Sequence, residues 1–146
     1  MARKYQTGTY KPQNPQKYNG DINNIVWRSS WEFKFMRWCD LSDNVLEWSS
    51  EETIIPYICK TDNKPHRYFV DFKIKVRTKN GVKTYLVEVK PKSQTIPPVQ
   101  PKRKTKHYLE EVMTYAKNVS KWEYATKYCK DRGIEFKIIT EVELGI

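Results

Sequence analysis

Long apolar runs are missing from this sequence, and no segment approaches the roughly 20 apolar residues that a membrane-spanning helix needs. Cysteine is scarce, since Cys39, Cys59 and Cys129 are widely spaced and form no Cys-x-x-Cys pair. The two histidines, His66 and His107, have no partner at metal-ligand spacing. These absences argue against a membrane-embedded protein, a disulfide framework and a zinc site, and they favour a reducing compartment.

Acidic side chains are outnumbered by basic ones. The chain has 17 Asp and Glu against 27 Lys and Arg, a net charge of +10, and no acidic residue lies between Glu88 and Glu110. This balance favours a polyanionic partner, above all a nucleic acid. The length of 146 residues and the hydrophobic content of 38% suit one folded domain. Residues 1–21 are polar, so no secretory signal is expected.

Two strand patterns stand in the middle of the chain. Residues 67–76 and 83–90 alternate apolar and polar side chains, and the Asn-Gly dipeptide between them is typical of a hairpin turn. Asp71 lies in the middle of the first strand, although aspartate is a poor strand former. Glu88 and Lys90, two residues apart near the end of the second strand, are predicted to point to the same face.

The remaining patterns predict the fold class. Residues 1–24 show neither a helical nor a strand period, so we expect an extended basic and aromatic arm, flexible or laid over a single domain formed by residues 25–146. On the first helix, Trp31 and Trp38 fall at core spacing. Outside the hairpin, the patterns predict helices over 29–40, 106–117 and 120–131 and strands over 45–48, 53–57 and 135–140. We take the order of the core elements to be αβββαβ, which predicts an α/β fold with a central mixed sheet flanked by helices.

Asp71 and Glu88 form the minimal carboxylate pair for metal-dependent phosphodiester hydrolysis. Mg²⁺ binds few protein ligands, prefers carboxylate oxygens and keeps several waters, so two or three acids suffice. We expect Mg²⁺ at this pair, with Mn²⁺ able to substitute. Lys90 is expected to orient or deprotonate the attacking water, or to pair with developing charge. The alternative is a solvent-facing strand on which the acids pair with Lys73 and Lys90.

Glu32 is a third candidate ligand with a competing structural explanation. It lies in the first turn of the first predicted helix, from which it could reach the edge of the sheet. However, Ser29-x-x-Glu32 also matches a capping box, in which the glutamate bonds back to the backbone at the start of the helix. Pattern alone favours the cap.

Clustered cations provide candidate contacts to DNA. The proline-stiffened loop after Lys90 carries most of them, and we expect it to place them beside the carboxylates. No recognition helix or zinc finger is predicted, so the contacts are expected to be to the backbone and largely independent of sequence. The DNA-binding candidates are Arg28, Lys92, Lys102, Arg103, Lys104 and Lys106.

With these residues in place, the chain resembles the PD-(D/E)xK, restriction-endonuclease-like nucleases. The resemblance implies that Asp71 and Glu88 are metal ligands, that Lys90 is the catalytic lysine and that Glu32 is the helix carboxylate. Val70 stands where the motif name has proline, a departure that leaves the metal chemistry intact. The implied fold is the restriction-endonuclease-like αβββαβ core.

A narrower resemblance is to the head completion nucleases of T4-like bacteriophages, and a more distant one is to TnsA-type transposition endonucleases. The segments that carry it are residues 1–6, 28–37, 48–52, 55–57 and 66–72. With it, Arg28-Ser-Ser-Trp-Glu32 is interpreted as a motif and Glu32 as catalytic as well as a possible cap.

The resemblance implies a DNA endonuclease that acts on packaged DNA in head completion, before tail attachment. Its implied partners are portal, head or neck proteins, and its implied location is the virion or the host cytoplasm. The alternatives are a non-catalytic head-neck protein that binds portal and DNA, and the catalytic subunit of a TnsA-like transposition machine.

Overall fold

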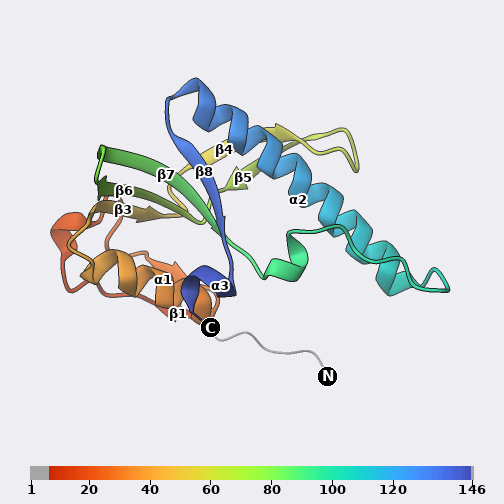
Figure 1. Cartoon of the computed structure of the whole chain (residues 1–146), viewed down its shortest axis with the longest axis horizontal. Coiled ribbons are helices and arrows are strands. Elements are labelled where there is room, and N and C mark those ends of the chain that lie inside the picture. The colour runs from red at the N-terminus through yellow and green to blue at the C-terminus, as the bar shows by residue number, and fades with distance from the viewer. Residues whose placement is uncertain (1–6, 146) are drawn as a thin grey trace.

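The structure is a computed structural model of the chain and describes residues 7–145 (Figure 1). The helices are α1 (Ser30–Leu41), α2 (Lys106–Asp131) and α3 (Glu141–Leu144), with short 3₁₀ turns η1 (Pro15–Lys17) and η2 (Lys92–Gln94). The strands are β1 (Gly8–Thr9), β2 (Val26–Trp27), β3 (Val45–Ser50), β4 (Ile54–Ile58), β5 (Pro65–Phe69), β6 (Phe72–Thr78), β7 (Gly81–Val89) and β8 (Glu135–Ile139). None of the helices in this range is both long and apolar enough to cross a bilayer.

A four-stranded mixed sheet in the order β3-β6-β7-β8 organises the domain. The β3, β6 and β7 strands pair antiparallel, whereas β8 returns parallel to β7 through α2. Neighbouring residues of β7 enter different cores, because Val87 packs with α1 residues and Leu86 clusters with Ala125 and Cys129 of α2. Since successive strand side chains point to opposite faces, α1 and α2 cover opposite faces of the sheet, as Figure 1 shows.

The first strand of the predicted hairpin is two strands, which corrects the expectation of one continuous strand. Its first half, β5, pairs with β4 in a separate two-stranded ribbon, and its second half, β6, enters the central sheet. The break falls at Val70 and Asp71, where Val70 N donates to Thr53 O at 3.0 Å and Glu51 N donates to Asp71 O at 3.1 Å. Asp71 therefore lies at a bend between two sheets, a position that suits a poor strand former.

The two helices predicted over 106–117 and 120–131 are one helix, α2, of 26 residues. Ser120 suggests a new start by its capping preference, but its hydroxyl donates to Ala116 O at 3.1 Å within the helix. The local signal is therefore satisfied without a break. As Figure 1 shows, the first half of α2 projects beyond the sheet, with the preceding loop running beside it.

The described part of the N-terminal arm is laid over the domain. Tyr10 and Tyr18 are buried in the core beneath α1, and Tyr18 forms a bridge with Trp48 of β3. Tyr5 lies outside the described residues. On α1, Trp38 is 47% exposed while its neighbour Cys39 is fully buried, which corrects the expectation that Trp38 is a core residue.

Candidate active site

The predicted catalytic residues of the hairpin meet where β6 begins and β7 ends. In the antiparallel register Phe72 pairs with Val87, so the next position outward places Asp71 beside Glu88. Asp71 Oδ2 also accepts a hydrogen bond from Val89 N at 2.9 Å. The aspartate is therefore held against the Glu88-x-Lys90 segment.

The Asp71 carboxyl is poorly compensated by its surroundings. Burial raises the pKa of Asp71 to about 7, although the hydrogen bond from Val89 opposes the shift. The negative charge of Glu32 raises this pKa further, and the positive charge of Lys90 lowers it. A carboxylate in this position lacks a counter-charge of sufficient strength.

Glu88 is the most buried acid of the group, with 6% exposure. The Tyr68 hydroxyl donates a hydrogen bond to Glu88 Oε2, and Lys90 Nζ lies 3.8 Å from Glu88 Oε1. Burial raises the pKa of Glu88, and the nearby charges of Lys90 and Lys121 oppose that rise. Glu88 is thus fixed in place by a neutral donor and faces two cations.

Ser29 caps α1 as predicted, but the Glu32 carboxylate bonds back to Arg28 N rather than to the backbone of Ser29, so the reciprocal capping box is not formed. Ser29 Oγ accepts from Glu32 N at 3.1 Å, and Glu32 Oε2 accepts from Arg28 N at 2.9 Å. Burial raises the pKa of Glu32, with the Arg28 backbone opposing the shift. The hydrogen-bonded cap of α1 is therefore supplied by the Ser29 hydroxyl.

Arg28, predicted to contact DNA, forms a bidentate ion pair with Glu51. Its Nε and Nη2 lie 2.9 and 3.2 Å from the two oxygens of Glu51. Glu51 has a left-handed backbone, with φ of 55°, which is uncommon for a residue other than glycine. The pair sits beside Glu32 and Asp71 and adds an acid to the surroundings of the site.

Sequence reasoning missed three residues of this centre, Glu51, Tyr68 and Lys121. Tyr68 precedes Asp71 by three residues but reaches Glu88 across the fold, so spacing along the strand gave no sign of the contact. Lys121 lies on α2. The sequence pattern that could have identified it is a lysine on the same helix face as Ala125, the face that packs against the sheet.

The predicted DNA-binding cations are spread along the projecting loop rather than gathered beside the carboxylates. Lys92 stays close to the sheet, where its backbone N–H donates to Glu141 Oε1 at 2.9 Å. Residues 102–104 and Lys106 lie towards the far end of the projection, as Figure 1 shows. This corrects the expectation that the whole loop places its charges next to the site, because α2 starts far from the sheet.

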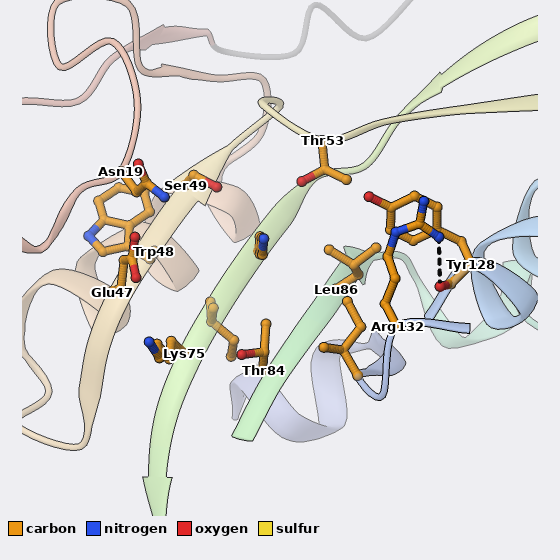
Figure 2. Close-up of a pocket in the computed structure, with 13 residues that line it drawn as sticks. Asn19, Glu47, Trp48, Ser49, Thr53, Lys75, Thr84, Leu86, Tyr128 and Arg132 are labelled. Atoms are coloured by element: carbon orange, nitrogen blue, oxygen red, sulfur yellow. Dashed lines mark hydrogen bonds between the residues drawn. The ribbon is translucent and has the colours of Figure 1, made fainter. Parts of the chain in front are cut away.

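A separate basic hollow of about 320 Å³ lies on the α2 side of the sheet (Figure 2). Its cations include Lys73 and Lys75 of β6 and Arg132 after α2. In Figure 2, Arg132 lies over the ring of Tyr128 and donates to the carbonyl of that residue at 3.2 Å. None of the four predicted catalytic residues lines this hollow, so it is an additional charged surface and not the candidate site.

Glu32, Asp71 and Glu88 are candidate ligands for a divalent cation, although their oxygen atoms do not all come within 4.8 Å of one another. Glu32, Asp71 and Glu88 offer oxygen donors from three different elements, and burial together with mutual repulsion leaves them short of positive charge. A divalent cation is the usual compensation for such a group. All three candidate ligands offer oxygen donors, which hard divalent cations prefer.

A second group of metal-ligating side chains lies on the β4–β5 hairpin. Ligand atoms of Cys59, Asp62 and His66 come within 4.8 Å of one another. Each is already partnered, because His66 Nε2 lies 2.8 Å from Asp62 Oδ2 and Cys59 Sγ lies 3.0 Å from Thr61 Oγ1. These contacts explain the cluster as a hydrogen-bonded turn.

The chain is similar to known nuclease sequences over most of its length. Residues 42–141 match the family model of the TnsA-like endonuclease N terminal. The head completion nuclease of Enterobacteria phage T4 is 38% identical over 139 residues, which cover 92% of this chain and 91% of that protein. The resemblances to head completion nucleases and to TnsA-type endonucleases are thereby confirmed, and so is the predicted restriction-endonuclease-like α/β fold.

Proposed function

Because the chain belongs to the TnsA-like endonuclease N-terminal family and is a homologue of the phage T4 head completion nuclease, we propose that it is a metal-dependent DNA endonuclease of the PD-(D/E)xK type. The observation that supports the proposal is the raised pKa of Asp71, whose surroundings include the charges of Glu32 and Lys90, together with the contact of Lys90 with Glu88.

The roles follow from the contacts of each residue. Asp71 and Glu88 would hold Mg²⁺, with Glu32 as a third carboxylate ligand. The ion, when bound, supplies charge stabilisation at the phosphoryl oxygens and lowers the pKa of a bound water. Lys90, held 3.8 Å from Glu88, orients the attacking water or pairs with the developing negative charge. The buried positions of the acids exclude bulk water and strengthen these interactions.

The proposed setting is phage head completion. We infer action on packaged DNA before tail attachment, with portal, head or neck proteins as partners and the virion or host cytoplasm as the location. The basic side chains Lys92, Lys102, Arg103, Lys104 and Lys106 would contact DNA backbone in a largely sequence-independent way. The match to the TnsA-like model favours one alternative setting, a catalytic subunit of a transposition machine.

The test is cleavage of supercoiled plasmid with Mg²⁺ or Mn²⁺. The wild-type protein should nick or linearise the plasmid, and this cleavage should stop when EDTA removes the metal. Lys90→Ala and Glu88→Gln should each lose roughly two orders of magnitude in rate, the scale of removing one transition-state stabiliser. Asp43 is an exposed acid in the turn after α1, so Asp43→Asn is the matched control and should cleave normally.

DNA binding without cleavage in any metal would contradict the proposal. That result would favour a non-catalytic head-neck protein, since such a protein needs the basic surface but not the acids.

A further inference from the structure

Lys121 lies on the face of α2 that packs against the sheet. It precedes Ala125 by one turn and Cys129 by two, and both of these belong to the buried cluster that contains Leu86 of β7. Because β7 and β8 are parallel, the connecting α2 runs antiparallel to them. Four helical residues and two strand residues each span roughly 6 Å. The step from Ala125 back to Lys121 on α2 therefore runs alongside the step from Leu86 to Glu88 on β7. Leu86 belongs to the buried apolar cluster, and Glu88 belongs to the candidate site.

Contacts through Tyr68 agree with this placement. The Lys121 ammonium lies 5.5 Å from the centre of the Tyr68 ring, whose hydroxyl donates to Glu88. Among residues 7–145, no carboxylate oxygen lies within the 4.0 Å of an ion pair with Lys121. The side chain is half-buried, and burial lowers its pKa while the charge of Glu88 opposes that shift.

A half-buried ammonium without a direct counter-ion is costly to maintain. Among residues 7–145, the tyrosine ring and the carboxylates of Glu88 and Asp71 at longer range offset this cost. The N–H donors of Lys121 are therefore available to a ligand beside Glu88. They approach from α2, on the face of the sheet opposite to α1, which carries Glu32.

We propose that Lys121 is a further catalytic residue that binds the scissile phosphodiester, and that Tyr68 is a positioning residue that holds Glu88. This inference rests on the proposed nuclease function. Negative charge on the phosphoryl oxygens grows in the transition state, so a fixed ammonium stabilises that state more than the ground state. Lys90 and Lys121 would then approach the phosphate from a strand and from a helix.

The first test compares kcat for Lys121→Met and Lys121→Arg. Methionine keeps an unbranched side chain over the Tyr68 ring but removes the charge, and we expect kcat to fall roughly 10²-fold. Arginine keeps the charge and should retain most of the rate. Lys127→Met, at an exposed position of the same helix, is the control and should match wild type. A wild-type kcat in Lys121→Met would overturn the catalytic role.

The second test does not depend on cleavage. In an Asp71→Asn background, Lys121→Met should reduce the slope of log K against log salt for binding a short DNA duplex by about 0.9, the value for one phosphate contact. Lys127→Met should leave the slope unchanged. If no protein cleaves but this slope falls, the hydrolytic proposal fails while the phosphate contact stands. An unchanged slope overturns the contact.

Tyr68→Phe tests the positioning role. The variant keeps the ring beneath Lys121 but removes the hydroxyl that bonds Glu88. The Mg²⁺ concentration for half-maximal cleavage should rise roughly 10- to 100-fold, the usual effect of losing a hydrogen bond that orients a metal ligand. A shift in kcat alone, at unchanged metal dependence, would contradict this role for Tyr68.

Discussion

Asp40 and Asp71 differ in the number of hydrogen-bond donors that surround their carboxylates. Asp40, fully buried at the end of α1, accepts hydrogen bonds from the Tyr10 hydroxyl at 2.7 Å and from the backbone N–H groups of Gln13 and Asn14 at 2.8 and 2.9 Å. Asp71, at the bend between β5 and β6, accepts one hydrogen bond from the described residues, donated by the backbone N–H of Val89. Only the first acid is fully provided with donors.

The pKa values show what the difference means. Burial alone would raise the pKa of Asp40, but its three hydrogen bonds together with the charge of Lys17 outweigh burial and hold this pKa below the ordinary value. At Asp71 burial prevails and raises the pKa to about 7. The carboxylate of Asp40 therefore ties the N-terminal arm to α1, whereas the carboxylate of Asp71 is left to attract a cation. Burial of an acid does not by itself indicate a functional site. A buried carboxylate with few hydrogen-bond donors does indicate one.

The largest expected effect comes from Asp71→Asn. Plasmid cleavage should fall roughly 10²- to 10³-fold, because the variant loses a metal-binding charge while its amide oxygen still accepts from Val89. The metal-free protein at pH 8 should nevertheless melt a few degrees higher, at about 2–4 °C per kcal/mol for a chain of this size. Paired measurements of cleavage rate and Tm in EDTA check both directions. A lower Tm would show that Asp71 is a structural acid like Asp40.

Asp40→Asn should have the opposite effects, a loss of stability with unchanged cleavage. One carboxylate oxygen becomes an amide nitrogen that faces hydrogen-bond donors, so the free energy of unfolding should fall by roughly 2–4 kcal/mol. Urea unfolding measures this loss, with the exposed Asp43→Asn expected within about 0.5 kcal/mol of wild type. Cleavage per folded molecule at low temperature should stay unchanged. Loss of cleavage in the fully folded variant would erase the distinction between the two acids.

The two acids should also give opposite pH dependence in metal-free protein. Asp40 has a lowered pKa, so its stabilisation is present above the ordinary value of about 3.9 and is lost as the pH falls through its folded pKa. Asp71 has a raised pKa, so its contribution is fully present below about 3.9 and is lost as the pH rises through about 7.

The measurement is Tm against pH in EDTA for wild type and both asparagine variants. Asp71→Asn should flatten the curve between about pH 4 and 7, and Asp40→Asn should flatten it below about pH 4. Flattening of the same pH range by both variants would contradict the assigned directions.

The contrast between the two acids marks how far the sequence alone could lead. Alternation along β7 predicted that Glu88 and Lys90 share a face, and the hairpin turn set the register that places Asp71 beside Glu88. Those relations are local, so a pattern of period two contains them. The helix start at Ser29 was likewise readable, because its capping signal lies within four residues.

Long-range contacts explain what the sequence left hidden. The break at Asp71 depends on β4 drawing β5 into its own ribbon, and the contact of Tyr68 with Glu88 spans 20 residues of chain. The place of Lys121 depends on how α2 crosses the sheet. For Asp40, the partners come from an arm without any periodic pattern, so nothing in the sequence distinguished its surroundings from those of Asp71.

The smallest expected change in stability separates the two roles of the α1 start. Ser29→Ala removes the acceptor for Glu32 N and should cost about 1 kcal/mol of unfolding free energy while cleavage persists. Glu32→Gln keeps an acceptor for Arg28 N, so it should cost less than Ser29→Ala, yet it removes the charge that completes the acidic group. Urea unfolding and plasmid cleavage on the same two proteins check the pair. If Glu32→Gln cleaves like wild type, Glu32 belongs with Asp40 as a structural acid, because its bond to Arg28 N would then be its whole function.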